Sequence, residues 1–163
     1  MGIYIALVSI VVLIGVDQLI KFLVDANMVV GQSIPVIQNI FHLTYVENKG
    51  SAFGLFSGHR EFLIIIAVVL LAAGVWLMLS RKIKGNFVLT CAAMIIAGGL
   101  GNLIDRIFRG AIIDYLDFPF LNFYIFNFAD CLVVVGVICF IVYLLFGDYF
   151  KRKKHVKLER ESV

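Results

Sequence analysis

"IIDYLDFPFLNFYIFNFADCLVVVGV", residues 112–137, places three aspartates directly before an apolar run that is long enough to enter a membrane. The aspartates are Asp114, Asp117 and Asp130. A carboxylate in or near hydrocarbon costs several kcal/mol unless it is paired or protonated, so its presence there indicates a functional site. What these carboxylates can do depends on the side of the membrane on which they lie and on the polar residues that join them.

The composition of the whole chain is that of an integral membrane protein. Of its 163 residues, 62% are hydrophobic and 15% are charged, whereas an ordinary soluble domain is about half apolar and a quarter charged. A helix that crosses a hydrocarbon core of about 30 Å needs roughly 20 apolar residues. Four runs of about this length are present, at residues 3–24, 62–79, 87–104 and 131–147. We therefore predict one membrane-embedded domain of four helices over residues 1–150.

The first run is expected to stay in the mature protein. A cleaved signal peptide would have a positively charged start, which this chain lacks, and Asp17 and Lys21 interrupt the apolar stretch. Asp17 and Lys21 are four residues apart on a helix and are predicted to form a structural pair, with Lys21 reaching toward the outer interface.

Basic residues predict the topology, because Lys and Arg are retained on the cytoplasmic side of a membrane. Nine of the fourteen basic residues fall within residues 81–84 and 151–160. We therefore expect both termini to be cytoplasmic, and segments 25–61 and 105–130 to face outward. Residues 151–163 would form a basic cytoplasmic tail next to anionic lipid.

The first outward segment contains a β-strand pattern. In "NIFHLTYVENKGSAFG", residues 39–54, apolar and polar side chains alternate before a turn at residues 48–50, a pattern typical of a short strand. The predicted fold is thus all-α and integral to the membrane, with four transmembrane helices and a small extracytoplasmic cap that contains short β-strands. A plain spacer between helices is the alternative for this segment.

Polar residues gather at the outer ends of the third and fourth runs. Asn102, Asp105 and Arg106 have the spacing that places them on one face of a helix. Asp105 and Arg106 could alternatively satisfy each other as an interfacial cap. Asn127 and Asp130 are three residues apart at the start of the fourth run, where helix capping is the alternative role.

Asp114 and Asp117 point to opposite faces of a strand but to the same face of a helix. Their spacing leaves open which one turns inward. Asn48 belongs to the same outer level of the predicted topology, so polar groups from different segments converge at one depth.

Two close carboxylates share a proton, because both cannot ionise easily. The charged member can activate water and the neutral member can protonate a carbonyl or a leaving amine. Other hydrolytic chemistries fit less well: no H-E-x-x-H zinc motif occurs, Cys131 has no evident activating cation, and Ser51 has no histidine near it in sequence. The three cysteines are expected to be packing residues. We expect no metal, no cofactor and no nucleic-acid partner.

Five blocks of the sequence resemble, in order and spacing, the signature blocks of the lipoprotein signal peptidases, also called signal peptidase II. The blocks cover most of the chain from the first run to the start of the fourth, and jointly they are highly specific. They are "DQLIK" (17–21), "ENKGSAFG" (47–54), "GNLIDR" (101–106), "GAIIDYLDF" (110–118) and "FNFAD" (126–130).

The resemblance implies a bacterial aspartic endopeptidase of the cytoplasmic membrane, with its active site on the extracytoplasmic side. Its substrates would be diacylglyceryl-modified prolipoproteins, cleaved just before the lipidated cysteine. We also expect membrane lipid as surroundings and a monomeric enzyme. It also implies that Asp114 and Asp130 are the catalytic residues. The residues implied to support them are Asn48, Gly50, Asn102, Asp105, Arg106, Asn127 and Ala129.

This chain departs from the family pattern at a few positions, which concern fine substrate preference. Ser51 stands where alanine is common, and Ile112, Ile113 and Tyr115 replace the commoner residues around Asp114.

Two other classes remain as alternatives to a peptidase. A small four-helix transporter could use buried carboxylates to couple ion or proton movement, although such sites usually lie near the membrane midplane. A non-catalytic assembly subunit would tolerate neutral substitutes for Asp114 and Asp130.

Overall fold

Four long helices make up most of the structure, a computed structural model that describes residues 2–50, 56, 58–83, 85–121 and 123–161, with side chains as far as residue 147. Ser51 and the basic side chains of the tail lie outside this part. Within it, four helices are long and apolar enough to cross a membrane, as predicted. They are α1 (Ile3–Asn27), α2 (Arg60–Leu79), α3 (Asn86–Phe108) and α4 (Phe128–Glu161), the last of them spanning with Phe128–Gly147.

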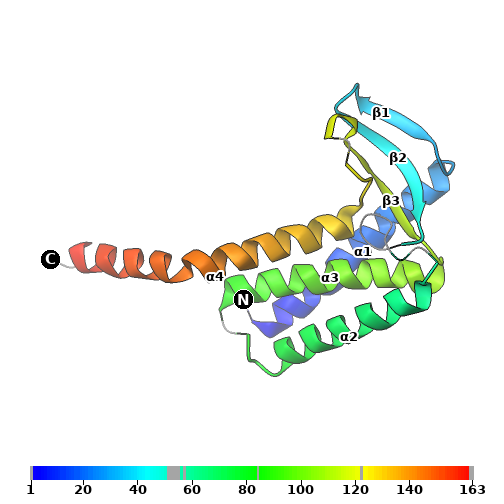
Figure 1. Cartoon of the computed structure of the whole chain (residues 1–163). Helices are drawn as coiled ribbons and strands as arrows, with labels where there is room; N and C mark the ends of the chain where they lie inside the picture. The colour runs from blue at the N-terminus through cyan, green and yellow to red at the C-terminus, as the bar shows by residue number, and fades with distance from the viewer. Residues whose placement is uncertain (1, 51–55, 57, 84, 122, 162–163) are drawn as a thin grey trace.

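Helix α3 lies at the centre of the bundle and packs against the other three helices (Figure 1). Two of its glycines permit this close packing, as small residues do in membrane helices. A Cβ atom on Gly98 would collide with the backbone oxygen of Ala129 in α4, and one on Gly101 would meet the carboxylate of Asp17 in α1. The chain therefore brings three helices together at the level of its outer polar residues.

An open three-stranded antiparallel sheet stands at one end of the helices (Figure 1). Its strands are β1 (Ser33–Ile37), β2 (Phe41–Asn48) and β3 (Ile112–Asp117), in that order. Tyr45, Ile113 and Tyr115 pack against Val24 near the end of α1, which fixes the sheet on the bundle. The predicted fold class and the strand predicted from the alternation are confirmed, and the spacer alternative is wrong.

All four helices extend further toward the sheet than their apolar runs, as α3 and α4 illustrate. Helix α3 continues to Phe108 rather than ending near residue 104. Gly110 follows two residues later with a φ of +85°, which glycine adopts readily and which is common just after a helix. Helix α4 begins at Phe128 rather than near residue 131. Polar side chains at these ends find partners in the protein, so the helices do not stop where the apolar runs stop.

Both termini lie at the end of the bundle opposite the sheet, and so does the connection between α2 and α3 (Figure 1). Helix α4 projects beyond the other helices at this end, as its backbone continues into the basic tail. The connection carries Arg81 and Lys82, whereas the sheet end carries both acidic and basic side chains, some of which form ion pairs such as Lys21 with Asp105.

Candidate active site

Strand β3 and the start of α4 bring Asp114 and Asp130 to the junction between the sheet and the bundle. Asn127 links them: its side-chain amide donates to Asp114 Oδ1 over 2.6 Å, and its backbone N–H donates to Asp130 Oδ2 over 3.2 Å. The two aspartates that the resemblance selected are therefore connected through a single residue.

Asn127 is also the N-cap of α4. Its side-chain oxygen accepts a hydrogen bond of 3.0 Å from the backbone N–H of Asp130, while the Asp130 carboxylate accepts from the backbone N–H of Asn127. This reciprocal pair has the form of a capping box. The capping role that was an alternative for these residues is present, and it positions the Asp130 carboxylate in the first turn of the helix.

Two more asparagines complete the donors to the carboxylates. Asn48, at the end of β2, donates to Asp114 Oδ2 over 3.0 Å, and Asn102 of α3 donates to Asp130 Oδ1 over 2.8 Å. Each of the four carboxylate oxygens thus accepts one N–H group. The orientation of Asn48 is itself fixed, because its side-chain oxygen accepts from the backbone N–H of Gly50 over 2.9 Å.

Asp117 does not belong to this group. Its carboxylate accepts a hydrogen bond of 2.7 Å from the hydroxyl of Thr44. Asp114, in contrast, is paired with Val46 in the sheet and contacts the asparagines. Of the two aspartates that the spacing could not separate, Asp114 is the one that turns toward Asp130.

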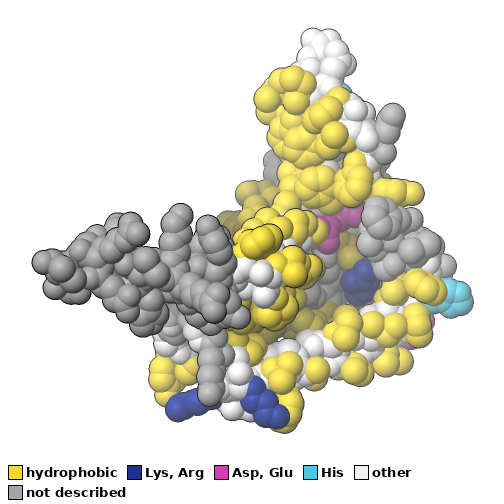
Figure 2. Space-filling model, turned by 60° about the vertical axis from the view of Figure 1, so that its left-hand side comes forward, with side chains coloured by type: hydrophobic (Ala, Val, Ile, Leu, Met, Phe, Trp, Pro, Cys, Tyr) yellow, Lys and Arg dark blue, Asp and Glu magenta, His cyan; other side chains and the backbone are white. Residues whose placement is uncertain are grey.

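The two carboxylates differ in exposure. Asp114 is only 3% exposed, and this burial, together with the charge of Asp130, raises the pKa of Asp114 to about 7. Asp130 is half-buried. Figure 2 shows acidic and basic side chains close together in a hollow of a largely hydrophobic face, below the lobe that carries the sheet. Acidic side chains are thus accessible from this face of the molecule.

The other residues implied by the resemblance surround the pair. Arg106 donates to the backbone oxygen of Gly50 over 3.0 Å, and the backbone N–H of Ala129 donates to Asp17 over 3.1 Å. Asp105 forms its ion pairs with Lys21, at 2.8 Å, and with Arg109, at 3.5 Å, rather than with Arg106.

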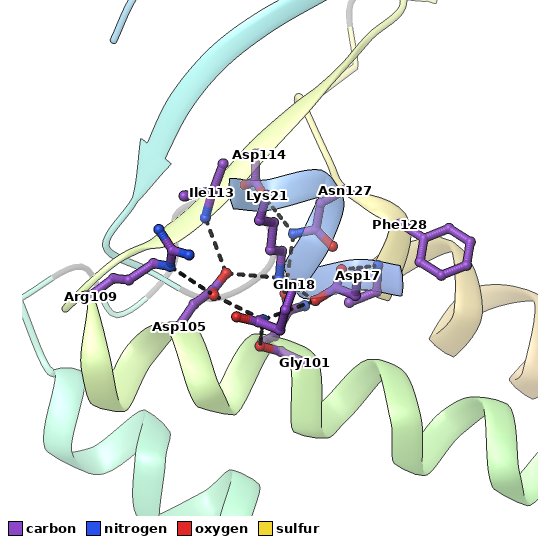
Figure 3. Close-up of polar contacts among 12 residues, drawn as sticks. Asp17, Gln18, Lys21, Gly101, Asp105, Arg109, Ile113, Asp114, Asn127 and Phe128 are labelled. Atoms are coloured by element: carbon purple, nitrogen blue, oxygen red, sulfur yellow. Dashed lines mark hydrogen bonds and ion pairs between the residues drawn. The ribbon is translucent and has the colours of Figure 1, made fainter. Parts of the chain in front are cut away.

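Sequence reasoning missed two polar residues of α1 that lie beneath the site. The predicted pair of Asp17 and Lys21 is present at 2.9 Å, but Lys21 does not reach the outer interface. Its side chain is completely buried and points to Asp105 (Figure 3), and its Nζ also donates to Asn102. Gln18 contacts Asp17, Asp105 and the backbone oxygen of Gly101. The signals for these residues were the "DQLIK" block and, for Lys21, its helical spacing from Asp17.

The chemistry available at this junction is that of carboxylates and amides. Among the described residues, no group of three or more His, Cys, Asp and Glu side chains could hold a metal ion. One carboxylate with a pKa near 7 beside a second carboxylate is an arrangement suited to general acid–base catalysis.

Fold and site together define a multi-pass membrane protein with paired carboxylates at one end of its helices. The family model of signal peptidase (SPase) II matches residues 9–146, and the chain belongs to this family. It is thus a membrane protease, and the transporter alternative finds no support.

Relatives and solved structures agree with this assignment. The chain is 45% identical to the lipoprotein signal peptidase of Clostridioides difficile (strain 630), over 85% of this chain and 93% of the relative. It is 43% identical to the lipoprotein signal peptidase of Fusobacterium nucleatum, over 90% of this chain and 87% of the relative. A solved bacterial membrane enzyme superposes with a TM-score of 0.81 at 32% identity, covering 88% of each chain.

Proposed function

We propose that the chain is an aspartic endopeptidase that removes the signal peptide from diacylglyceryl-modified prolipoproteins by cleaving before the lipidated cysteine. The observation that carries the proposal is the connection of Asp114 and Asp130 through Asn127 in a chain of this family. The relatives named as lipoprotein signal peptidases support the substrate class.

In the proposed reaction Asp114 holds the proton of the pair and Asp130 is the charged member. Asp130 removes a proton from a water molecule, whose oxygen attacks the carbonyl carbon of the scissile peptide bond. Asp114 gives its proton to the carbonyl oxygen, which forms a tetrahedral diol. As the carbon–nitrogen bond breaks, Asp130 passes its proton to the leaving nitrogen and Asp114 regains one from the diol, so both carboxyl groups return to their first state.

The supporting residues have positioning roles in this proposal. Asn48, Asn102 and Asn127 hold the carboxylates through the amide donors described above. Arg106 and Gly50 connect the end of β2 to α3 next to the pair.

The proposed topology puts both termini in the cytoplasm and the sheet outside. It is supported by the common position of the termini and the α2–α3 connection at one end of the bundle (Figure 1), together with the retention of basic residues on the cytoplasmic side. A fluorescent protein fused to the C-terminus should fold and fluoresce, whereas a periplasm-dependent reporter at that position should be inactive. The opposite pattern would place the proposed site on the wrong side.

The experiment that tests the function uses the purified protein and a diacylglyceryl-modified prolipoprotein peptide. Mass spectrometry should show two products, with the new N-terminus at the lipidated cysteine. Cleavage at another bond, or an intact substrate, would contradict the proposed reaction.

A further inference from the structure

A buried ion cluster lies directly beneath the proposed pair of carboxylates. It consists of Asp17 and Lys21 from α1 and Asp105 from α3, and each of these three side chains is completely buried. Lys21 Nζ lies 2.9 Å from Asp17 Oδ2 and 2.8 Å from Asp105 Oδ2. Figure 3 shows Lys21 between the two carboxylates, with Asn127 and Asp114 beyond it. The ion pair between Lys21 and Asp105 already joins α1 to α3, whereas the pair with Asp17 lies within α1.

Lys21 makes a third contact that neither ion pair requires. Its Nζ donates to Asn102 Oδ1 over 3.0 Å, so the three N–H groups of the ammonium have three acceptors. Asn102 Oδ1 also accepts from the side-chain amide of Asn127 over 3.1 Å. Two donors therefore converge on one oxygen of Asn102.

These donors determine which way the Asn102 amide is turned. An ammonium group can only donate hydrogen bonds, so the oxygen of Asn102 must face it and the NH2 group must point away. In this orientation the NH2 group donates to Asp130 Oδ1 over 2.8 Å. A flipped amide would place N–H groups against Lys21 and would leave Asp130 facing an oxygen.

We infer that Lys21 is a positioning residue of the reaction, which acts through Asn102 to orient the carboxylate of Asp130. The inference rests on the proposed function, because it takes Asp130 to be a member of the catalytic pair. It goes beyond a structural pairing of Lys21 with Asp17, since that pairing alone would leave Asn127 as the one described donor to the oxygen of Asn102.

Gln18 provides a matched control within the same cluster. Its side-chain amide lies 3.2 Å from Asp17, 3.1 Å from Asp105 and 3.1 Å from the backbone oxygen of Gly101. It therefore contacts both carboxylates of the cluster, as Lys21 does, but the structure gives it no hydrogen bond to Asn102. If both side chains served only to stabilise the protein, substitutions of Lys21 and of Gln18 would lower kcat only to the extent that they lower the melting temperature.

The test compares Lys21→Met and Gln18→Met with the wild-type protein in kcat, KM and melting temperature. Lys21→Met should lower kcat by about 100-fold with KM within about threefold of the wild type, because a displaced catalytic group slows the chemical step more than it weakens binding. Gln18→Met should keep kcat within about threefold of the wild type. Loss of kcat in both variants in proportion to their melting temperatures would overturn the inference.

Lys21→Met leaves two buried carboxylates without their cation and could fail to fold. The triple variant Asp17→Asn, Lys21→Met, Asp105→Asn removes all three charges together and supplies a foldable version of the same test. Its kcat should be as low as that of Lys21→Met. A triple variant that folds and regains the wild-type kcat would show that Lys21 serves only to neutralise its carboxylates.

A spectroscopic measurement separates this inference from the proposed function. In protein labelled with 15N-asparagine, the Asn102 side-chain amide signal is identified by its loss in Asn102→Ser. This signal should shift in Lys21→Met or the triple variant and stay in place in Gln18→Met. Absence of turnover by the wild-type protein would defeat the proposed function, whereas an unchanged Asn102 signal without Lys21 would defeat the positioning role.

Discussion

Asn127 donates its side-chain amide to Asp114 over 2.6 Å, and this is a short contact at the proposed pair of carboxylates. The same residue caps α4 through its side-chain oxygen, which accepts from the backbone N–H of Asp130 over 3.0 Å. The side-chain nitrogen of Asn127 thus holds Asp114 of the sheet. Its side-chain oxygen holds the start of α4, the helix that carries Asp130. These two roles can be separated by mutation.

Asn127→Ser and Asn127→Ala both remove the amide donor to Asp114, but serine keeps an oxygen that can cap the helix. Both variants should lose activity by roughly 10- to 100-fold, the effect expected for a hydrogen bond to a charged or proton-sharing group. Only Asn127→Ala should also lose about 1 kcal/mol of stability from the missing cap. Turnover and thermal unfolding of the two purified variants test this. Equal melting temperatures, or an active Asn127→Ser, would contradict the double role.

The pKa of Asp114 predicts how activity depends on pH. Burial, and next the charge of Asp130, raise this pKa to about 7, so Asp114 is protonated below that pH and can act as the acid. Activity should therefore fall as the pH rises through about 7.

Asn48→Ala should change the pH at which activity falls, and the direction of this change can be measured. The hydrogen bond from Asn48 lowers the pKa of Asp114, so its removal should raise that pKa and move the alkaline fall of activity to higher pH. Lys21, whose charge also lowers this pKa, stays in place in the variant. A shift of the alkaline limb to lower pH would count against Asp114 as the acid.

Cleavage should depend on the diacylglyceryl group of the substrate. Between β3 and α4, Phe120, Phe123 and Tyr124 are 59%, 53% and 58% exposed, and they offer an apolar surface to acyl chains. Anchoring by these chains would hold the scissile bond at the depth of the carboxylates. In paired assays, the unlipidated precursor should be cleaved at least about 100-fold more slowly. Equal rates for the two precursors would refute this dependence.

Activity should survive strong chelators, because the proposed reaction uses two carboxylates and water. Turnover measured before and after dialysis against EDTA should be the same. Loss of activity that zinc restores would argue for a metal-dependent hydrolysis.

The sequence predicted those parts of the structure that depend on composition and short-range pattern. Apolar runs of membrane length gave the helices, and alternation around Tyr45 gave a strand. The helix ends were predicted less accurately. Asn127 begins α4 through a hydrogen bond and Gly110 follows the end of α3 with a positive φ, and hydropathy contains neither kind of information.

The contacts of the site could be predicted only in part. Which of Asp114 and Asp117 turns inward depends on the register between β2 and β3, where the pairing shifts between Leu43 and Val46. The bond from Lys21 to Asn102 joins residues 81 positions apart, so periodicity within one helix could reveal only the pair with Asp17. The motif blocks indicated which residues belong to the site, but they did not indicate which side chains contact each other.

The central claim, that Asp114 and Asp130 carry out the chemistry, is tested most directly by single-turnover cleavage of a lipidated prolipoprotein peptide by aspartate-to-asparagine variants. Asp114→Asn, Asp130→Asn and the double variant should each be slower than the wild type by at least about 1,000-fold, with the double variant little worse than either single one, because the two residues act as a unit. Asp117→Asn, whose carboxylate contacts Thr44 instead, should stay within about tenfold of the wild type. A well-folded Asp114→Asn that cleaves near the wild-type rate, together with an inactive Asp117→Asn, would contradict the account.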